Sequence, residues 1–440
     1  MISCPPKWQT RSSLTKKFVK IVHFVSTLLI IITSLLLDTA STEAYLQGQY
    51  GQSTMPVAGV QDGGFSIRAH SIYDINAVSR VFGEAAYSWG QTEGNRWVEN
   101  ADYELLYPYL TCDTVGGGMR SEQYYFRGGY RMAKHHIIWH LALQYRALQS
   151  YRSVDPRPKN KVADLRVEGS IGYTHNQYAY SLMAQVGRYK QNNDISFYSE
   201  LGDAMIFHLV QPDKDYARFA GAFKSSYYHG ITVGGTLMIQ PQQRGFLAGL
   251  DYHYLRITKE LSTATSIPMA DICTHDMGAQ FGYAAPRWRV MAQGGYTWRR
   301  GTQYIYGEAA NQYYNLLLKS SNYAENQWHI GALGSYDCIL PIGHLTIRGD
   351  VQYLQKRPST LSAGATTNAL SLQFAQLASY LTASQAQAKL SVRYAFPIAG
   401  RYAWFIEPAA AYTCYLPTTA AISHTASHRW MAILKTGICF

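Results

Sequence analysis

The C-terminal stretch, residues 428–440, restricts the fold of this chain more than any other stretch does. Its residues alternate between an apolar and a mixed face, which is the period of a half-buried β-strand. A strand of a soluble sheet usually leads into a polar tail, whereas this one ends on its apolar face with an aromatic residue. The apolar face carries Trp430, Ala432, Leu434, Thr436, Ile438 and Phe440.

This ending resembles the C-terminal strand of outer-membrane β-barrel proteins. In those proteins the terminal aromatic residue is part of the signal that the barrel assembly machinery reads. The resemblance implies the same role for Phe440. It also implies that the assembly machinery and outer-membrane lipids are partners of this chain.

The composition agrees with a membrane barrel. Charged residues make up 15% of the chain, against about 25% in a soluble globular domain. The sequence holds 36 tyrosines, whose rings suit the boundary between lipid and water. The formal net charge of +11 is spread along the chain rather than gathered in a patch, so nucleic acid is not predicted as a partner.

The first 44 residues are predicted to be a cleaved signal peptide, which implies export. A basic region ending at Lys20 precedes the apolar run 21–37, and Thr42-Glu43-Ala44 provides a small-residue cleavage site. The alternative is a single transmembrane anchor, because the apolar run approaches the length of about 18 residues that a spanning helix needs. No basic stop-transfer cluster follows the run, which favours the signal peptide.

Many later stretches alternate as the terminal one does. In 163–173, 288–298 and 386–396, apolar residues alternate with charged and amide residues. A soluble β-sandwich also alternates, but its strands usually have about 5–6 residues, and these run for roughly 10–13. We therefore predict an all-β fold, a transmembrane antiparallel up-and-down barrel of about 16 strands, or about 14 if the weakest fail.

Connection lengths favour the same fold, because short periplasmic turns and longer outer loops alternate along a membrane barrel. One further strand, near Ala204–Val210, is needed to keep the alternation, and 227–230 is then a short outer connection. The predicted turns are 174–177, 241–245, 285–287, 339–343 and 397–400, and the predicted long outer loops lie near 258–272, 301–325, 357–383 and 414–427.

The barrel is predicted to span 76–440. Residues 45–75 are rich in glycine and glutamine, and they are assigned to a periplasmic lead or an inserted plug. The loop 358–383 contains no charged residue, and it is predicted to hold a short helix. That loop would either constrict the pore from within or cap it from outside.

The whole sequence after residue 44 resembles an uncharacterised outer-membrane β-barrel family of Gram-negative bacteria, known as a domain of unknown function. The resemblance rests on Asp155-Pro156-Arg157-Pro158-Lys159-Asn160, which leads into the strand 162–173, and on the terminal strand. It implies a barrel in the outer membrane. It supplies no activity and no functional residues.

Few residues are arranged for catalysis or metal binding. His136 and His140 share a face, but residues four apart on a strand are separated by about 13–14 Å, too far for one metal ion. Asp251 and His253 are candidates for an embedded hydrolase, although no GxSxG nucleophile motif is present. We therefore predict no metal, no cofactor and no enzymatic activity.

Charged residues opposite the apolar faces are predicted to line the lumen. One interpretation is a ladder of salt bridges that hydrates the interior, and the other is a field that favours anions. Arg348 and Arg393 are expected to lie close together, with Asp350 able to neutralise only one of them. The candidates are Arg166, Glu168, Arg289, Arg348, Asp350, Lys389, Arg393, Glu407 and Lys435.

Three classes of function follow from this fold. The first is a pore or transport barrel for small hydrophilic solutes, with anions as the sharper interpretation. The second is a structural or interaction barrel that serves a surface or secretion complex. The third is a barrel-embedded hydrolase.

Overall fold

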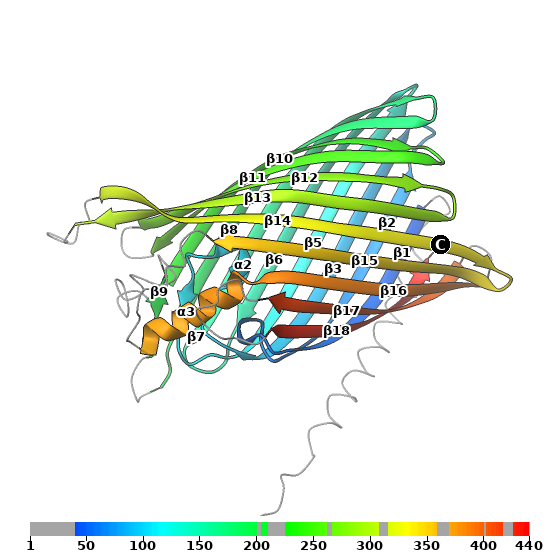
Figure 1. Cartoon of the computed structure of the whole chain (residues 1–440). Helices are drawn as coiled ribbons and strands as arrows, with labels where there is room; N and C mark the ends of the chain where they lie inside the picture. The colour runs from blue at the N-terminus through cyan, green and yellow to red at the C-terminus, as the bar shows by residue number, and fades with distance from the viewer. Residues whose placement is uncertain are drawn as a thin grey trace, which may run out of the picture.

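The computed structural model describes residues 40–199, 204–209, 225–261, 266–307, 316–358, 369–399, 402–416 and 426–439. Its strands form a closed antiparallel barrel of 16 strands, as predicted (Figure 1). The barrel strands are β1 (Ala40–Ser53), β2 (Gln61–Asp74), β3 (Ser79–Asn95), β5 (Gly117–Lys134), β6 (Ile137–Tyr151), β7 (Arg157–His175), β8 (Tyr178–Ser196), β10 (Ser225–Pro241), β11 (Gly245–Leu261), β12 (Ile267–Ala284), β13 (Trp288–Tyr306), β14 (Leu316–Leu340), β15 (Gly343–Pro358), β16 (Ser384–Ala399), β17 (Tyr402–Leu416) and β18 (Ser427–Cys439).

The alternation of the sequence decides which side chains face outward. On β7, Leu165 and Val167 are 41% and 38% exposed, whereas Asp164 and Glu168 are 6% and 8% exposed. An apolar outer face with polar groups inside is the arrangement that lipid requires. Closure of the barrel also gives every strand a partner on both sides, so no edge is left with unpaired backbone groups.

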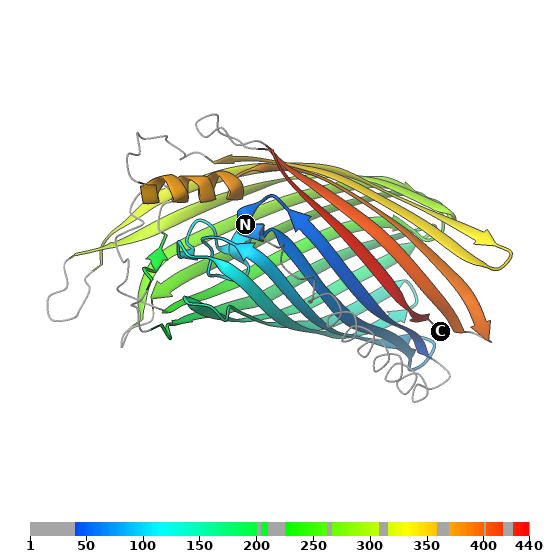
Figure 2. The ribbon, with the colours of Figure 1, turned by 90° about the horizontal axis from the view of Figure 1, so that it is seen from below.

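The barrel closes through its N-terminal strands, which corrects the predicted boundary at residue 76. β1 pairs with β18 on one side and with β2 on the other, so most of residues 45–75 belong to the wall (Figure 2), while Met55 and Val57 in the connection between β1 and β2 join the buried cluster at the loop end. These strands escaped prediction because Gly48 and Gly51 interrupt the apolar alternation of β1. Residues 1–39 of the predicted signal peptide lie outside the described residues, and 40–44 begin β1.

The extra strand predicted near Ala204–Val210 is not part of the barrel wall. The segment instead holds β9 (Phe207–His208), which pairs with β4 (Thr111–Cys112) in a separate two-stranded sheet. The connection predicted at 227–230 lies inside β10. The strand count nevertheless holds, because β1 and β2 replace two predicted strands. These are the strand near Ala204–Val210 and the strand that a connection at 227–230 would require before it.

The two ends of the barrel differ. At one end, here called the turn end, most strands are joined by two to four residues, as at 135–136 and 176–177. At the other end, called the loop end, the connections include most of the longer ones, although 258–272 proves to be mostly strand, with only 262–266 between β11 and β12. The C-terminal strand finishes at the turn end (Figure 1).

Four segments gather inside the loop end, and together they are called the plug (Figure 1). They are η1 (Pro56–Ala58), the connection 96–116 with α2 (Tyr103–Leu106) and β4, the segment 204–209 with β9, and α3 (Ala369–Leu381). The helix predicted within 358–383 is therefore present. Among the described residues, no helix is long and apolar enough to span a bilayer.

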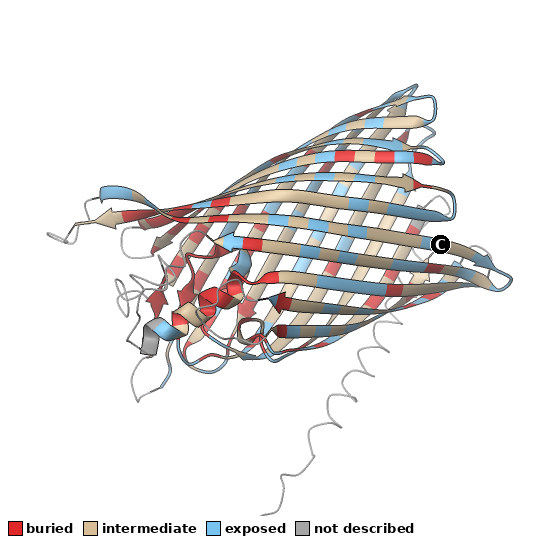
Figure 3. Ribbon diagram, in the orientation of Figure 1, coloured by how far each residue is buried: buried red, intermediate tan, exposed pale blue. Residues whose placement is uncertain are grey.

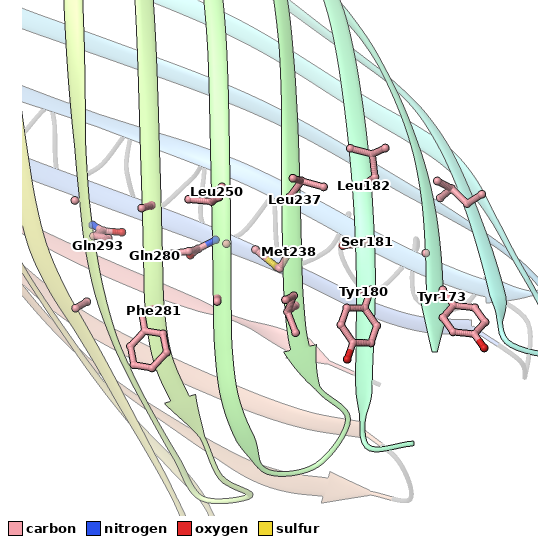
Figure 4. A pocket seen from close by; sticks show the side chains of 18 of the residues that line it. Tyr173, Tyr180, Ser181, Leu182, Leu237, Met238, Leu250, Gln280, Phe281 and Gln293 are labelled. Carbon is pink, nitrogen blue, oxygen red and sulfur yellow. The ribbon is translucent and has the colours of Figure 1, made fainter. Parts of the chain in front are cut away.

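The outer face carries an apolar hollow of about 1090 Å³ near the turn end (Figure 4). Large side chains such as Leu182, Leu250 and Phe281 surround it, and Ala248 and Ala279 leave the space between them. The hollow lies on the lipid-facing side, because Leu250 alternates with residues that face the lumen. It therefore belongs to the lipid-facing apolar band rather than to the interior.

Candidate functional site

The plug fills the loop end through an apolar core that it shares with the barrel wall. Leu106, Tyr109 and Phe374 of the plug are 1% exposed, and they share one buried cluster with Tyr228 and Ile257 of the wall (Figure 3). Burying one large apolar side chain contributes about 1.5–3 kcal/mol. Residues of β7, β8, β10, β11, β12, β14 and β17 take part in this cluster, so a packed core joins the plug to the wall at the loop end.

Basic side chains of the wall hold the plug by donating hydrogen bonds to it. Buried carbonyl groups outside a β-ladder need such donors. Wall and plug are thus joined by polar as well as apolar contacts. The donors are Lys259 Nζ to Leu110 O (2.8 Å), Arg299 Nη2 to Leu105 O (3.0 Å) and Tyr107 O (2.8 Å), Lys356 Nζ to Leu381 O (2.9 Å), and Arg146 Nη2 to Asp102 Oδ2 (2.6 Å).

A buried ion cluster fixes the long connection 96–116 to the neighbouring connection between β6 and β7. Arg152 Nη2 donates to Glu99 Oε1 at 2.6 Å and also to Asp113, and all three side chains are at most 2% exposed. Burial, reinforced by the adjacent Asp113 carboxylate, raises the pKa of Glu99. Burial also opposes ionisation of Asp113, but hydrogen bonds from Glu99 and Arg152 lower its pKa. When Glu99 holds its proton, one cation faces one carboxylate, and the cluster is neutral.

Beneath the plug the lumen holds a chamber, formed by two adjoining cavities of about 780 and 550 Å³. Cavities of about 300–1,000 Å³ are the usual size of sites for small molecules. The plug supplies the roof with Asp102, Tyr103 and Glu104. Both cavities are lined by Leu105, Asp164, Arg166, Thr274 and Thr297.

The predicted lumen residues in the chamber half are paired. Arg166 lines the chamber, and its Nη2 lies 3.0 Å from Asp164 Oδ2. Glu168 accepts a hydrogen bond of 2.7 Å from Arg127 Nη2 across the intervening strand. In this half of the lumen the ladder of salt bridges is the interpretation that the geometry favours.

A glycine lets polar side chains meet across one strand of the chamber wall. Gly234 on β10 lies between Gln185 on β8 and His253 on β11. A Cβ at Gly234 would lie 2.2 Å from His253 Nδ1, so its absence permits the contact of 2.8 Å between that nitrogen and Gln185 Nε2. His253 Nε2 lies 3.8 Å from Asp251 Oδ2. Both ring nitrogens of this hydrolase candidate therefore have neighbours that fix its position.

Three of the predicted lumen residues remain as free cations, two toward the turn end on β13 and β15 and one near the middle of β16. Arg289, Arg348 and Lys389 are exposed. Within the described part of the chain, none of them has an ion pair or a hydrogen bond from its side chain. Among the described residues, the lumen therefore holds paired charges near the plug, and farther from it both paired groups and uncompensated cations.

Arg348 and Arg393 do lie two register positions apart on neighbouring strands, but the expectation that only Asp350 could neutralise them is wrong. Arg393 binds Glu43 through two hydrogen bonds of 3.1 Å. Closure of the barrel through β1 brings this carboxylate into reach, and sequence reasoning had assigned it to the removed signal peptide. Asp350, the expected partner of one arginine, instead accepts a hydrogen bond of 3.1 Å from Gln352.

The remaining predicted residues have simple outcomes. Lys435 Nζ donates to Glu407 Oε1 at 3.1 Å, so this candidate pair is a salt bridge. Phe440 lies outside the described residues. His140 stacks on Phe82 with the ring centroids 5.3 Å apart. No group of three metal-ligating side chains occurs among the described residues.

Sequence reasoning missed the plug connection 96–116, although one signal for it exists. The stretch 105–112, Leu-Leu-Tyr-Pro-Tyr-Leu-Thr-Cys, contains no charged residue yet lies between two strands. An exposed loop of that composition would leave a large apolar surface in water. Such a stretch is therefore expected to be buried, and the barrel lumen is the nearest place that can bury it.

The sequence profile of the family described as "Family of unknown function (DUF6850)" matches residues 33–341, more than half of the chain. The chain belongs to this family. No curated protein sequence matches it. The family description agrees with the resemblance seen in the sequence, and it assigns no activity.

Several solved barrel structures are similar in part. CdiB from Acinetobacter baumannii is 8% identical with a TM-score of 0.40, and the match covers 91% of this chain and 60% of CdiB. The ferric preacinetobactin receptor BauA from the same organism is 9% identical with a TM-score of 0.35, covering 91% and 79%. The Pseudomonas putida toluene transporter TodX is 8% identical with a TM-score of 0.38, covering 92% and 90%. With identities and TM-scores this low, none of these similarities identifies what this family member binds.

Proposed function

We propose that this protein is an outer-membrane transport barrel for small hydrophilic solutes, closed in its resting state by the plug. The turn end faces the periplasm and the loop end faces the outside. The observation that carries the proposal is the charged chamber directly beneath a packed plug. A barrel with a purely structural role has no need for a hydrated cavity of this size behind a removable closure.

The chamber has the chemistry of a site for polar solutes. Its lining combines ion pairs, such as Arg166 with Asp164, with amide and hydroxyl side chains, such as Gln144 and Thr297. These groups can exchange hydrogen bonds with a solute in place of water, which lowers the cost of bringing a hydrophilic molecule into the lumen. The chamber thus favours solutes with several hydroxyl, amide or charged groups.

The closed loop end separates this proposal from an open porin. An open pore conducts at all times, whereas here a solute passes only when the plug moves. The chain's partners in this proposal are outer-membrane lipids around the apolar band, and the barrel assembly machinery, which would read the terminal Phe440. The predicted signal peptide would deliver the chain for export.

Conductance in planar bilayers tests the proposal. The wild-type protein is compared with a variant in which residues 99–113 are replaced by a short Gly/Ser linker. We expect the wild type to conduct little and the variant to form stable open channels, with small sugars entering proteoliposomes only through the variant. Heat-modifiable electrophoretic mobility verifies that both barrels are folded. A folded variant without conductance would refute transport, and a stable co-purifying partner would then support the interaction barrel.

A further inference from the structure

Four polar side chains occupy one row across four neighbouring strands near the turn end. Arg289 on β13 is opposite Ser335 on β14, and Ser335 is opposite Arg348 on β15. Arg348 is in turn opposite Ser391 on β16. Arginine and serine therefore alternate along one level of the wall, and this row is called the arginine–serine rung.

All four side chains of the rung face the lumen. Their sequence neighbours Val290, Tyr336, Ile347 and Leu390 are exposed on the lipid side, at 53%, 47%, 38% and 55%. Successive side chains of a strand point to opposite faces, so the rung faces inward. The two arginine positions are two strands apart, about 10 Å, with Ser335 between them. Side chains as long as arginine can converge over the serine at this spacing.

Within the described residues, the rung has no protein acceptor. None of its four side chains makes a hydrogen bond or an ion pair there. Two inward-facing carboxylates on the rung strands β14 and β15 bond other side chains: Asp337 accepts from Thr346 Oγ1 at 2.6 Å, and Asp350 Oδ2 accepts from Gln352 Nε2 at 3.1 Å. The buried Asp350 Oδ1 has no hydrogen-bond partner among the described residues, and it does not pair with either arginine of the rung. The rung therefore presents two exposed guanidinium groups and the half-buried hydroxyl of Ser335 to the lumen, while Ser391 is buried beside Arg348.

We propose that the arginine–serine rung is a binding site for an oxyanion, a carboxylate or phosphate group carried by a small solute. A guanidinium offers parallel N–H donors that match two oxygens of such a group, and its charge strengthens each bond. The hydroxyl of Ser335 adds a donor between the two guanidinium groups. The inference deepens the proposed transport function, since it specifies anionic solutes for the lumen. The binding itself does not depend on whether the plug opens.

Isothermal titration of the purified full-length protein with inorganic phosphate and with acetate, at low ionic strength, tests the rung. Arg289→Gln and Arg348→Gln should each weaken binding about tenfold, because each removes a charged donor pair. The double variant should bind neither probe measurably. Arg348→Lys keeps the charge but lacks the parallel N–H donors of the guanidinium. Its affinity for the probes should therefore fall between those of the wild type and Arg348→Gln.

The matched control is Arg244→Gln, which removes an exposed arginine from the turn between β10 and β11. It should bind both probes as the wild type does. Equal affinity of the double variant and the wild type would overturn the proposal, as would a wild type that binds neither probe. An equal loss in Arg244→Gln would reduce the effect to net charge and would also overturn it. If the wild type binds the probes but the variant without the plug does not conduct, the transport proposal is refuted and the binding site stands.

Discussion

The two halves of the lumen differ in their arginines: those beside the plug all have protein partners, whereas those toward the turn end include both paired and unpaired ones. Next to the plug, arginines are paired or bonded to carbonyls, and Arg152 with Glu99 and Asp113 is almost fully buried. Near the turn end, Arg289 and Arg348 are exposed, and within the described chain they have no partner. A buried charge without a partner is costly, so the closed half must pair its charges. An exposed charge, such as that of Arg289 or Arg348, needs no protein partner and stays available to solutes.

The largest expected effect comes from breaking the buried cluster of the closed half. Arg152→Met leaves the acids Glu99 and Asp113 without their cation, which should destabilise the plug by about 3–5 kcal/mol. Single-channel recording should show frequent opening of the variant. The control Arg157→Met removes an arginine that is paired with Asp155 but 39% exposed, and it should stay closed. Equal closure of both variants would show that the cluster does not anchor the plug.

Removing apolar packing from the plug should have a somewhat smaller effect. Phe374 of α3 is buried against the plug core, so Phe374→Ala should cost about 3 kcal/mol of plug stability. Leu372 on the same helix is 48% exposed, and Leu372→Ala should change little. Protease cleavage within the plug, in otherwise folded barrels, measures the difference. Similar cleavage of both variants would indicate that α3 covers the plug without holding it.

The anchoring of the plug should depend on pH through the buried acids. The pKa of Glu99 is raised, mainly by burial. The contribution of Glu99 to plug stability is therefore present at low pH and is lost as the pH rises through that raised pKa. The pKa of Asp113 is lowered, so its contribution is lost as the pH falls through that value. The plug should therefore open as the pH rises through the raised pKa of Glu99. Glu99→Gln keeps a neutral donor and should abolish this opening. An unchanged pH profile in the variant would show that Glu99 does not cause it.

Replacing an unpaired arginine should change the ion preference of the channel moderately, and more than replacing a paired arginine does. In a protein with the plug replaced by a linker, Arg348→Gln should shift the reversal potential under a salt gradient toward lower anion preference. Arg166→Gln, which removes the partner of Asp164, also lowers the charge by one, but it lies in the neutralised half. We expect a smaller shift from Arg166→Gln. The reverse order would mean that the chamber, not the rung, selects ions.

The smallest effect is expected from Glu43, whose carboxylate binds Arg393. Glu43→Gln should free that arginine and raise anion preference slightly in the same assay. If the signal peptide is cleaved after Ala44, the mature protein lacks residue 43 and the substitution has no effect. N-terminal sequencing of the mature protein distinguishes the two cases. A shift in a mature protein that begins at Tyr45 would contradict this account of Arg393.

The sequence by itself determined the barrel. Alternation within strands such as 162–173 specifies which face meets lipid, because a period of two assigns each residue to one side. Lipid then requires closure, since each backbone group needs a partner within the protein. The short helix near Phe374 also followed from a local pattern. These features depend on neighbours in sequence, and a single chain displays them. The strand number, in contrast, agreed only because the unpredicted β1 and β2 replaced strands that had been placed between β8 and β10.

Only the tertiary structure decided what the lumen contains. The residues of the connection 96–116 are loop-like in sequence, and their burial depends on contacts with β10, β11 and α3. Likewise, whether an arginine is free depends on the register between strands, which alternation does not specify. Arg393 meets Glu43 because closure places β1 near β16, whereas Arg348 meets a serine on either side. Which charges are paired is thus a property of distant segments brought together by the closed barrel.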